Sequence, residues 1–294
     1  MVGNAWTGSA LCRGLAMWAV QRVIFARAAA VTQALVLARA FAFALVLALA
    51  LALAGSIRVA AATEAQAASP TQFFEFESQQ QKLSMAYVDA QPAGPPIGTV
   101  LLLHGKNFSG DYWIQTVELL RAKGFRVVVP DQIGFGRSSM PGRYQFSFAQ
   151  LAANTKMLLM HLCIGKARVM GHSMGGMLGI QFALQYPEVT EQLLLLNPIG
   201  LEDWRAQGVP YVSIDKLHEA ELGKDFASIR VYQQRNYYDG AWTPEFERWA
   251  RLLADQYAGE RRAAFAWNMA LTADMILSQP VVYRLDQLRA PTVL

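Results

Sequence analysis

Short runs of apolar residues alternate with longer amphipathic segments from residue 98 onward. The apolar runs cover residues 99–103, 125–130, 167–170 and 192–196. Uninterrupted runs of this length are typical of strands buried on both faces of a parallel sheet. The intervening segments 111–123, 147–162 and 174–186 have helical lengths, and the first and last are followed by Gly124 and Pro187. This alternation predicts an α/β fold, a mostly parallel sheet with helices on both faces.

The pattern also divides the chain into regions. Two further strands are expected at residues 72–76 and 84–90, so a sheet core should cover 68–197. Residues 198–290 change to a helical pattern rich in Trp, Tyr and Phe, which indicates a helical cap or lid, or simply a second helical core. Residues 291–294 then start the next core strand.

The first 67 residues have the pattern of a targeting segment. Arg22, Arg27 and Arg39 precede an uncharged apolar run at 41–54, and Ala65-Gln66-Ala67 resembles a cleavage site. A basic start, a short apolar centre and a small-residue exit predict a secretory signal peptide, with export to the periplasm or medium. The alternatives are a retained membrane anchor formed by residues 40–57, or a true start at Met17 or later.

Charge and cysteine content exclude several classes of function. The net charge of +4 arises in residues 1–69, which hold five arginines and one acid, whereas residues 70–294 hold 21 basic and 21 acidic side chains. The expected globular part therefore has no excess charge for binding nucleic acid. The sequence has only two cysteines, Cys12 and Cys163, so no disulfide framework is expected. Its four histidines are scattered, so neither a metal site nor a cofactor is expected.

The most specific motif is Gly171-His172-Ser173-Met174-Gly175, a G-x-S-x-G sequence. An apolar strand leads into it and an amphipathic helix follows, which is the strand–turn–helix context of a nucleophile elbow. Gly171 and Gly175 are expected where a Cβ would clash in the tight turn. The turn would present Ser173 at the carboxyl end of a central strand, next to the N-terminus of the following helix.

Two more motifs lie earlier in the chain. His104-Gly105-Lys106-Asn107 follows the run at 99–103, and a D-x-x-G-x-G-x-S sequence begins at Asp131. Together with the G-x-S-x-G motif, in this order, they make residues 72–294 resemble the α/β-hydrolase superfamily. The resemblance implies an α/β-hydrolase fold with a helical cap.

The resemblance also assigns roles to individual residues. It implies an oxyanion hole formed by the backbone N–H groups of Lys106 and Met174, with the Asn107 side chain as a further possible donor. It implies that His104 is structural, and that Asp131 holds its loop together rather than acting as the catalytic acid.

The partners of a serine nucleophile are harder to find. The resemblance implies the order nucleophile, acid, histidine, yet His218 is the only histidine after Ser173, and we expect it to be a solvated residue of the lid. Asn197 occupies an alternative position for the acid, and Glu202 and Asp203 are expected in an opening helix turn. The catalytic acid and histidine are therefore expected to be absent from this chain. It would be either truncated within the seventh strand or not a working triad enzyme.

The resemblance implies a serine hydrolase that transfers the acyl group of an ester to water through an acyl-enzyme on Ser173. A serine at this position sets aside haloalkane dehalogenases and most epoxide hydrolases. The aromatic lid favours a small apolar or aromatic substrate. One alternative is an amidase or aminopeptidase of the proline-iminopeptidase type, with the substrate amine anchored by one of four acids of the lid: Glu202, Asp203, Glu219 or Glu221. The other is a non-catalytic binding protein, possible also as a membrane-tethered form.

Overall fold

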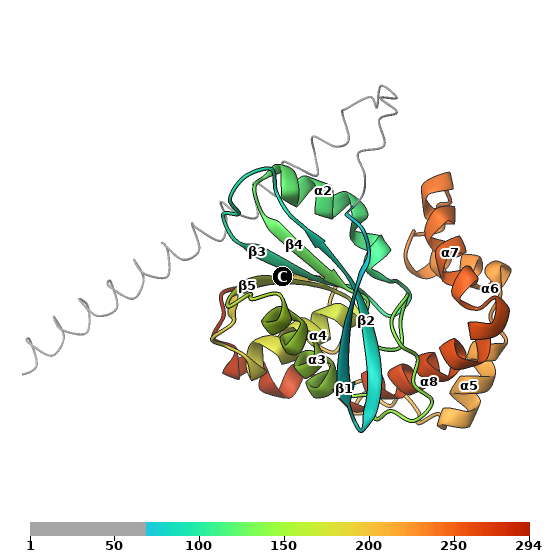
Figure 1. The fold of residues 1–294 in the computed structure, drawn as a ribbon. Coiled ribbons are helices and arrows are strands. Elements are labelled where there is room, and N and C mark those ends of the chain that lie inside the picture. Colours follow the sequence, from blue (N-terminus) through green and yellow to red (C-terminus); the bar gives the residue numbers. More distant parts are fainter. Residues whose placement is uncertain (1–68) are drawn as a thin grey trace, which may run out of the picture. The chain divides into compact units, whose positions relative to one another are not determined.

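The computed structural model describes residues 69–294, and a seven-stranded sheet forms the centre of this part of the chain (Figure 1). The predicted leader, 1–67, lies outside the described residues. The strands are β1 (Gln72–Ser78), β2 (Gln81–Ala90), β3 (Thr99–Leu103), β4 (Arg126–Pro130), β5 (Ala167–His172), β6 (Thr190–Leu196) and β7 (Thr292–Val293). Their order across the sheet is β1-β2-β4-β3-β5-β6-β7. β1 and β2 are antiparallel to their neighbours, and the other pairs are parallel, so the predicted mostly parallel sheet is confirmed.

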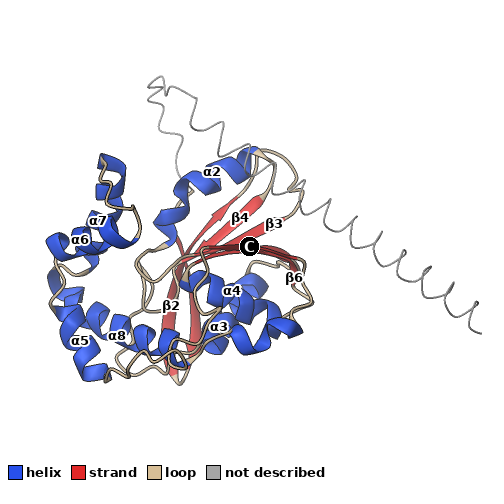
Figure 2. Ribbon diagram, turned by 180° about the vertical axis from the view of Figure 1, so that it is seen from behind, coloured by secondary structure: helices blue, strands red, loops and turns tan. Residues whose placement is uncertain are grey.

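Helices cover both faces of the sheet. α2 (Ile114–Ala122) lies on one face, while α3 (Phe148–His161) and α4 (Met174–Gln185) pack side by side on the other (Figure 2). Leu101, Leu102 and Leu103 of β3 are consequently completely buried. A fully apolar strand such as β3 is stable only in this setting, because both of its faces are removed from water.

The observed boundaries differ slightly from those predicted. The helix expected at 111–123 begins as a 3-10 turn, η1 (Gly110–Trp113), and becomes α-helical only from Ile114. The helix expected at 147–162 begins one residue later, because the Ser147 hydroxyl accepts the N–H of Gln150 at 3.0 Å and caps the helix. β6 starts two residues earlier than predicted, since Thr190 already pairs with Ala167.

Residues 197–291, here named the helical insertion, connect β6 to β7. The insertion contains α5 (Ile214–Leu222), α6 (Phe226–Asn236), α7 (Pro244–Gln256) and α8 (Arg262–Ser278), and two 3-10 turns, η2 (Gly259–Arg261) and η3 (Val282–Gln287). Ser213, Asp225 and Thr243 cap the first three helices through their side-chain oxygens, which explains where these helices begin. α5 packs against α8, and α6 packs against α7.

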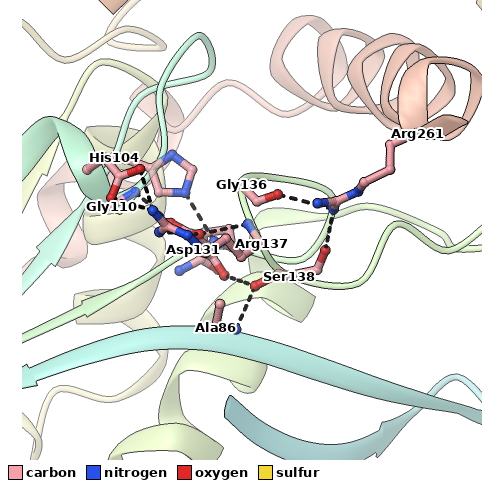
Figure 3. Close-up of polar contacts among 10 residues, drawn as sticks. Ala86, His104, Gly110, Asp131, Gly136, Arg137, Ser138 and Arg261 are labelled. Atoms are coloured by element: carbon pink, nitrogen blue, oxygen red, sulfur yellow. Dashed lines mark hydrogen bonds and ion pairs between the residues drawn. The ribbon is translucent and has the colours of Figure 1, made fainter. Parts of the chain in front are cut away.

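The start of α8 is attached to the loop that follows β4. The Arg261 guanidinium donates hydrogen bonds to the carbonyl oxygens of Gly136 at 3.1 Å and Ser138 at 3.3 Å (Figure 3). The Trp267 indole N–H donates to the carbonyl of Gly142 at 3.0 Å. Buried or half-buried carbonyl groups outside a sheet need such donors, so these contacts fix α8 relative to the core.

The predicted start of a further strand at 291–294 corresponds to β7, which pairs in parallel with β6 through Leu193↔Thr292 and Leu194↔Val293. Within residues 69–294, no helix is both long and apolar enough to cross a membrane.

Candidate active site

Ser173 occupies a strained turn between β5 and α4. Its backbone has φ 55° and ψ −117°, a conformation that residues other than glycine rarely adopt. The turn is held on both sides: the Ser173 N–H donates to the carbonyl of Leu196 at 3.0 Å, and the Ser173 carbonyl accepts the N–H of Gly176 at 2.9 Å. Such strain persists only where the surroundings enforce it, and here it places the serine at the carboxyl end of β5.

The glycines around Ser173 are required by close backbone approaches. A Cβ on Gly171 would lie 2.1 Å from the carbonyl oxygen of Gly175, and a Cβ on Gly175 would lie 2.2 Å from that of Leu103. Both separations are far below van der Waals contact. A Cβ on Gly105 would lie 3.3 Å from the Cβ of Ser173, so the loop after β3 passes directly beside the serine.

Two backbone N–H groups next to Ser173 are available to an incoming ligand. Met174 is the first residue of α4, where N–H groups have no acceptor within the helix. The N–H of Lys106, adjacent to Gly105, donates to no acceptor among residues 69–294. The Asn107 side chain, considered as a further donor, donates one amide hydrogen to the Tyr237 hydroxyl at 2.6 Å.

His104 is buried below this loop and both of its ring nitrogens are engaged. Nδ1 lies 2.9 Å from the carbonyl oxygen of Gly105, and Nε2 accepts the N–H of Gln132 at 3.0 Å. Because Nε2 accepts, the ring is neutral and Nδ1 carries its proton. Burial lowers the pKa of His104, although Asp131 and the Gly105 carbonyl oppose the change. These contacts fit the structural role expected for this residue.

Both carboxylate oxygens of Asp131 accept backbone N–H groups, one from its own loop and one from the segment after β3. Its Oδ1 accepts the N–H of Gly110 at 2.6 Å, and its Oδ2 accepts the N–H of Arg137 at 2.8 Å (Figure 3). The side chain is 3% exposed, and a buried carboxylate requires such donors. The geometry therefore fits the loop-holding role that the resemblance implied, rather than a catalytic acid, and it extends that role to the segment after β3.

The described histidines do not supply a base to Ser173, whose Oγ forms no hydrogen bond with any residue of 69–294. The His172 ring stacks on Tyr112 with centroids 5.0 Å apart. Burial of the ring and, to a smaller extent, the electrostatic effect of His104 lower the pKa of His172 to about 4. His218 was expected to be solvated, but it is half-buried and packs edge-on against Trp267 at 5.2 Å.

The acids considered from the sequence are also occupied elsewhere. The Trp204 indole donates to Glu202 at 2.7 Å, and the Tyr283 hydroxyl donates to Asp203 at 2.9 Å. Asp203 also accepts the N–H of Arg205 in a tight turn, so no helix opens here, contrary to expectation. Asn197 has a positive φ of 41° at the end of β6.

A cavity of about 580 Å³ opens at Ser173. Lys106 and Asn107 border it on the core side, and the helical insertion supplies most of the remaining wall. That wall is predominantly apolar and aromatic, with Ile199, Trp204, Ile229, Tyr232, Tyr237, Leu253, Ile276 and Leu277. A mostly apolar cavity with a few polar groups is typical of a small-molecule site.

Two of the residues that line the cavity, Lys106 and Lys224, belong to a group of four interacting side chains, here named the lysine cluster, which also includes Glu221 and Tyr257. Glu221 is 6% exposed and stands at the centre of the cluster. One of its oxygens accepts from Lys224 at 2.7 Å and from the Tyr257 hydroxyl, and the other lies 3.8 Å from Lys106. Burial raises the pKa of Glu221, but Lys106 and Lys224 outweigh it, so the pKa is lower than usual.

Lys106 also reaches α8. Its Nζ donates to the carbonyl of Met269 at 2.7 Å and to the Thr272 hydroxyl at 3.3 Å. Burial lowers the pKa of Lys106 from 10.5 to about 8, against the opposing effect of Glu221. The sequence identified only the backbone of Lys106, because nothing in the pattern around it indicated where the side chain would end.

This lowered pKa predicts how stability depends on pH. Between pH 8 and 10.5 the folded protein binds fewer protons at Lys106 than the unfolded chain, so rising pH favours folding. Relative to Lys106→Met, the wild-type free energy of unfolding should increase by about 2 kcal/mol from about pH 7 to about pH 9.5. Urea unfolding of both proteins at several pH values measures the difference, and a difference independent of pH would contradict the assignment.

Comparisons with known proteins agree with this architecture. The family model of the α/β hydrolase fold matches residues 98–286. Among solved structures, a protein described as a probable hydrolytic enzyme from Pseudomonas aeruginosa PAO1 is 52% identical, with a TM-score of 0.75 over 76% of this chain and 72% of that one. An esterase from Exiguobacterium antarcticum is 16% identical, with a TM-score of 0.61 over 75% and 79% of the two chains, a likeness of fold alone.

Curated relatives match shorter parts. An uncharacterized protein from Mycobacterium tuberculosis H37Rv is 36% identical over 109 residues, or 37% of this chain, and the chain spans only 30% of that protein's length. A protein of Rhizobium rhizogenes proposed to be a carbamate hydrolase, RutD, is 26% identical over 199 residues, or 68% of this chain and 73% of that one.

Proposed function

Because the chain belongs to the α/β-hydrolase fold family, we propose that it is a serine hydrolase that cleaves small-molecule esters through an acyl-enzyme on Ser173. The observation that carries the proposal is the placement of Ser173. It sits at positive φ on the turn between β5 and α4, borders the cavity, and has two unengaged backbone N–H groups beside it.

The chemistry follows from these positions. The Ser173 Oγ attacks the ester carbonyl, and the oxygen that becomes negative accepts hydrogen bonds from the N–H groups of Lys106 and Met174. Each fixed donor of this kind lowers the barrier by about 3 kcal/mol. Collapse of the intermediate releases the alcohol and leaves the acyl group on Ser173. Attack by water then releases the acid and restores the hydroxyl. A general base must take the Oγ proton, and among the described residues no side chain is hydrogen-bonded to that atom.

The cavity favours an ester over the substrate of an aminopeptidase. An aminopeptidase would need a carboxylate facing the substrate amine, but no acidic side chain lines the cavity within the described residues. Glu221, the candidate nearest to it, is covered by Lys106 and Lys224. The apolar wall supports an apolar or aromatic group in the substrate.

The two remaining regions have proposed roles as well. The helical insertion would act as the cap, since it provides most of the cavity wall. Residues 1–67 would direct export, with residues 40–57 as the alternative membrane anchor. The support for this is the basic, apolar and small-residue sequence pattern.

A fluorophosphonate probe tests the nucleophile, because only an activated serine hydroxyl reacts with it. In the protein isolated from its own cells, we expect one phosphonylated peptide, containing Ser173. Ser173→Ala should remove the label completely. Ser228→Ala is the matched control, since Ser228 also borders the cavity, and it should label normally.

Two results would contradict the proposal. Labelling that persists in folded Ser173→Ala would show that another residue is the nucleophile. A folded wild-type protein that never reacts would instead support the non-catalytic alternative, in which the cavity binds a ligand without converting it.

A further inference from the structure

The charged side chains that border the cavity are all positive. Lys106 and Lys224 both line it, and no carboxylate does so within the described part of the chain. Glu221 lies behind the two lysines and neutralises one of them. One positive charge therefore remains beside a largely apolar space and is available to an anion that enters the cavity.

The two lysines are not equivalent. Lys106 is held by Met269, Thr272 and Glu221, and its side chain is 18% exposed. The Lys224 side chain is 33% exposed, and among the described residues its ammonium group pairs only with the Glu221 carboxylate and lies 5.8 Å from the centre of the Tyr257 ring. An ammonium group has three N–H donors, so Lys224 can bind a ligand anion while it keeps its contact with Glu221.

The neighbouring groups leave this site cationic. Asp225 follows Lys224 in sequence, but its carboxylate caps α6 by accepting the N–H of Ser228 at 2.8 Å. Asp225 borders a separate surface depression and not this cavity. The Tyr257 hydroxyl donates its one hydrogen to Glu221, so it has no further hydrogen to donate to a ligand. Burial lowers the pKa of Lys106 and the nearby Lys224 lowers it further, while Glu221 opposes the change.

We propose that the cavity selects esters that carry a second, ionised carboxyl group, which Lys224 binds directly and Lys106 attracts through its charge. Half-esters of dicarboxylic acids are the simplest members of this class. Their methylene chain would contact the apolar wall, and their ester carbonyl would lie at Ser173. The inference rests on the proposed ester hydrolysis, whose substrate class it specifies.

The test compares a charged with a neutral substrate. The mono-4-nitrophenyl esters of adipic and suberic acid are paired with neutral 4-nitrophenyl esters of equal chain length. A charge-assisted hydrogen bond in a partly buried site predicts a kcat/KM at least about 10-fold higher for the half-esters in the wild-type protein. Lys224→Met should abolish this preference, which is measured as the ratio of the two kcat/KM values within the same variant, so that a change in the overall rate does not affect the result. Lys224→Arg should retain it.

Lys216→Met is the matched control, because Lys216 is an exposed lysine of α5 that does not border the cavity, and its preference should equal that of the wild type. Hydrolysis of both ester types without a preference, unchanged by Lys224→Met, would overturn the inference and leave the proposed function intact.

A binding measurement keeps the two proposals separable. Free adipate and suberate should raise the Tm of the wild-type protein but not that of Lys224→Met. If no ester is hydrolysed and Ser173 does not react with the phosphonate, the proposed function fails. A Tm shift that depends on Lys224 would then still establish the carboxylate site, and the absence of a shift would reject it.

Discussion

Gly175→Ala is expected to destabilise the protein by more than about 4 kcal/mol and to abolish phosphonate labelling of Ser173. The new Cβ would lie 2.2 Å from the carbonyl oxygen and 2.6 Å from the carbonyl carbon of Leu103. Both are backbone atoms of a completely buried strand, so no side-chain rotation can relieve the overlap. The helix α4 would have to move away from β3, and the turn that holds Ser173 would lose its geometry. A loss of this size is a large part of the 5–15 kcal/mol typical of a folded domain.

The matched control is Gly165→Ala, just before β5. No heavy atom lies within 4 Å of a Cβ at Gly165, so the change should alter stability by less than about 0.5 kcal/mol. Urea unfolding monitored by tryptophan fluorescence measures both variants. A midpoint for Gly175→Ala equal to that of the wild type would show that β3 and α4 are not in contact as described.

Asp131→Ala is expected to destabilise the protein by about 3 kcal/mol, because it leaves the part-buried N–H groups of Gly110 and Arg137 without their acceptor. Phosphonate labelling should also slow, since Gly110 belongs to the loop that carries Lys106. The control is Asp111→Ala, whose carboxylate pairs with the exposed Arg137 side chain at 2.8 Å. Ion pairs of that kind contribute about 1 kcal/mol or less. Equal losses in the two variants would show that Asp131 does not hold the loops together.

Local patterns were sufficient to predict the sheet and the placement of Ser173. Buried strands such as β3 and β5 can be recognised in the sequence as apolar runs. The turn at Ser173 requires a glycine two residues before it and another two residues after it. The role of Asp131 followed instead from the resemblance to the α/β-hydrolase superfamily, and one of its two backbone partners, Gly110, lies 21 residues away in the sequence. For the sheet and for the turn at Ser173, the interactions that decide the structure involve neighbouring residues or a regular period.

The lysine cluster could not be predicted in this way. Lys106 lies just beyond β3, Glu221 lies in the last turn of α5, and Tyr257 follows α7, so three separate segments meet only after the insertion packs on the core. A lysine or glutamate in a sequence is usually solvated, and no period distinguishes a buried one. His218 was interpreted wrongly for the same reason, since its contact with Trp267 depends on how α5 packs against α8.

The location of the helical insertion affects the order in which the sheet can assemble. β6 and β7 are adjacent strands, yet residues 197–291 lie between them, whereas β3 and β4 pair across a single short helix. Bringing two strands together across a long intervening segment loses more chain entropy than across a short one. This entropy is lost before the hydrogen bonds between the strands can compensate it. Collapse of α5–α8 first would shorten the effective distance between the two strands. The helices that enclose the cavity would thereby also bring β7 next to β6.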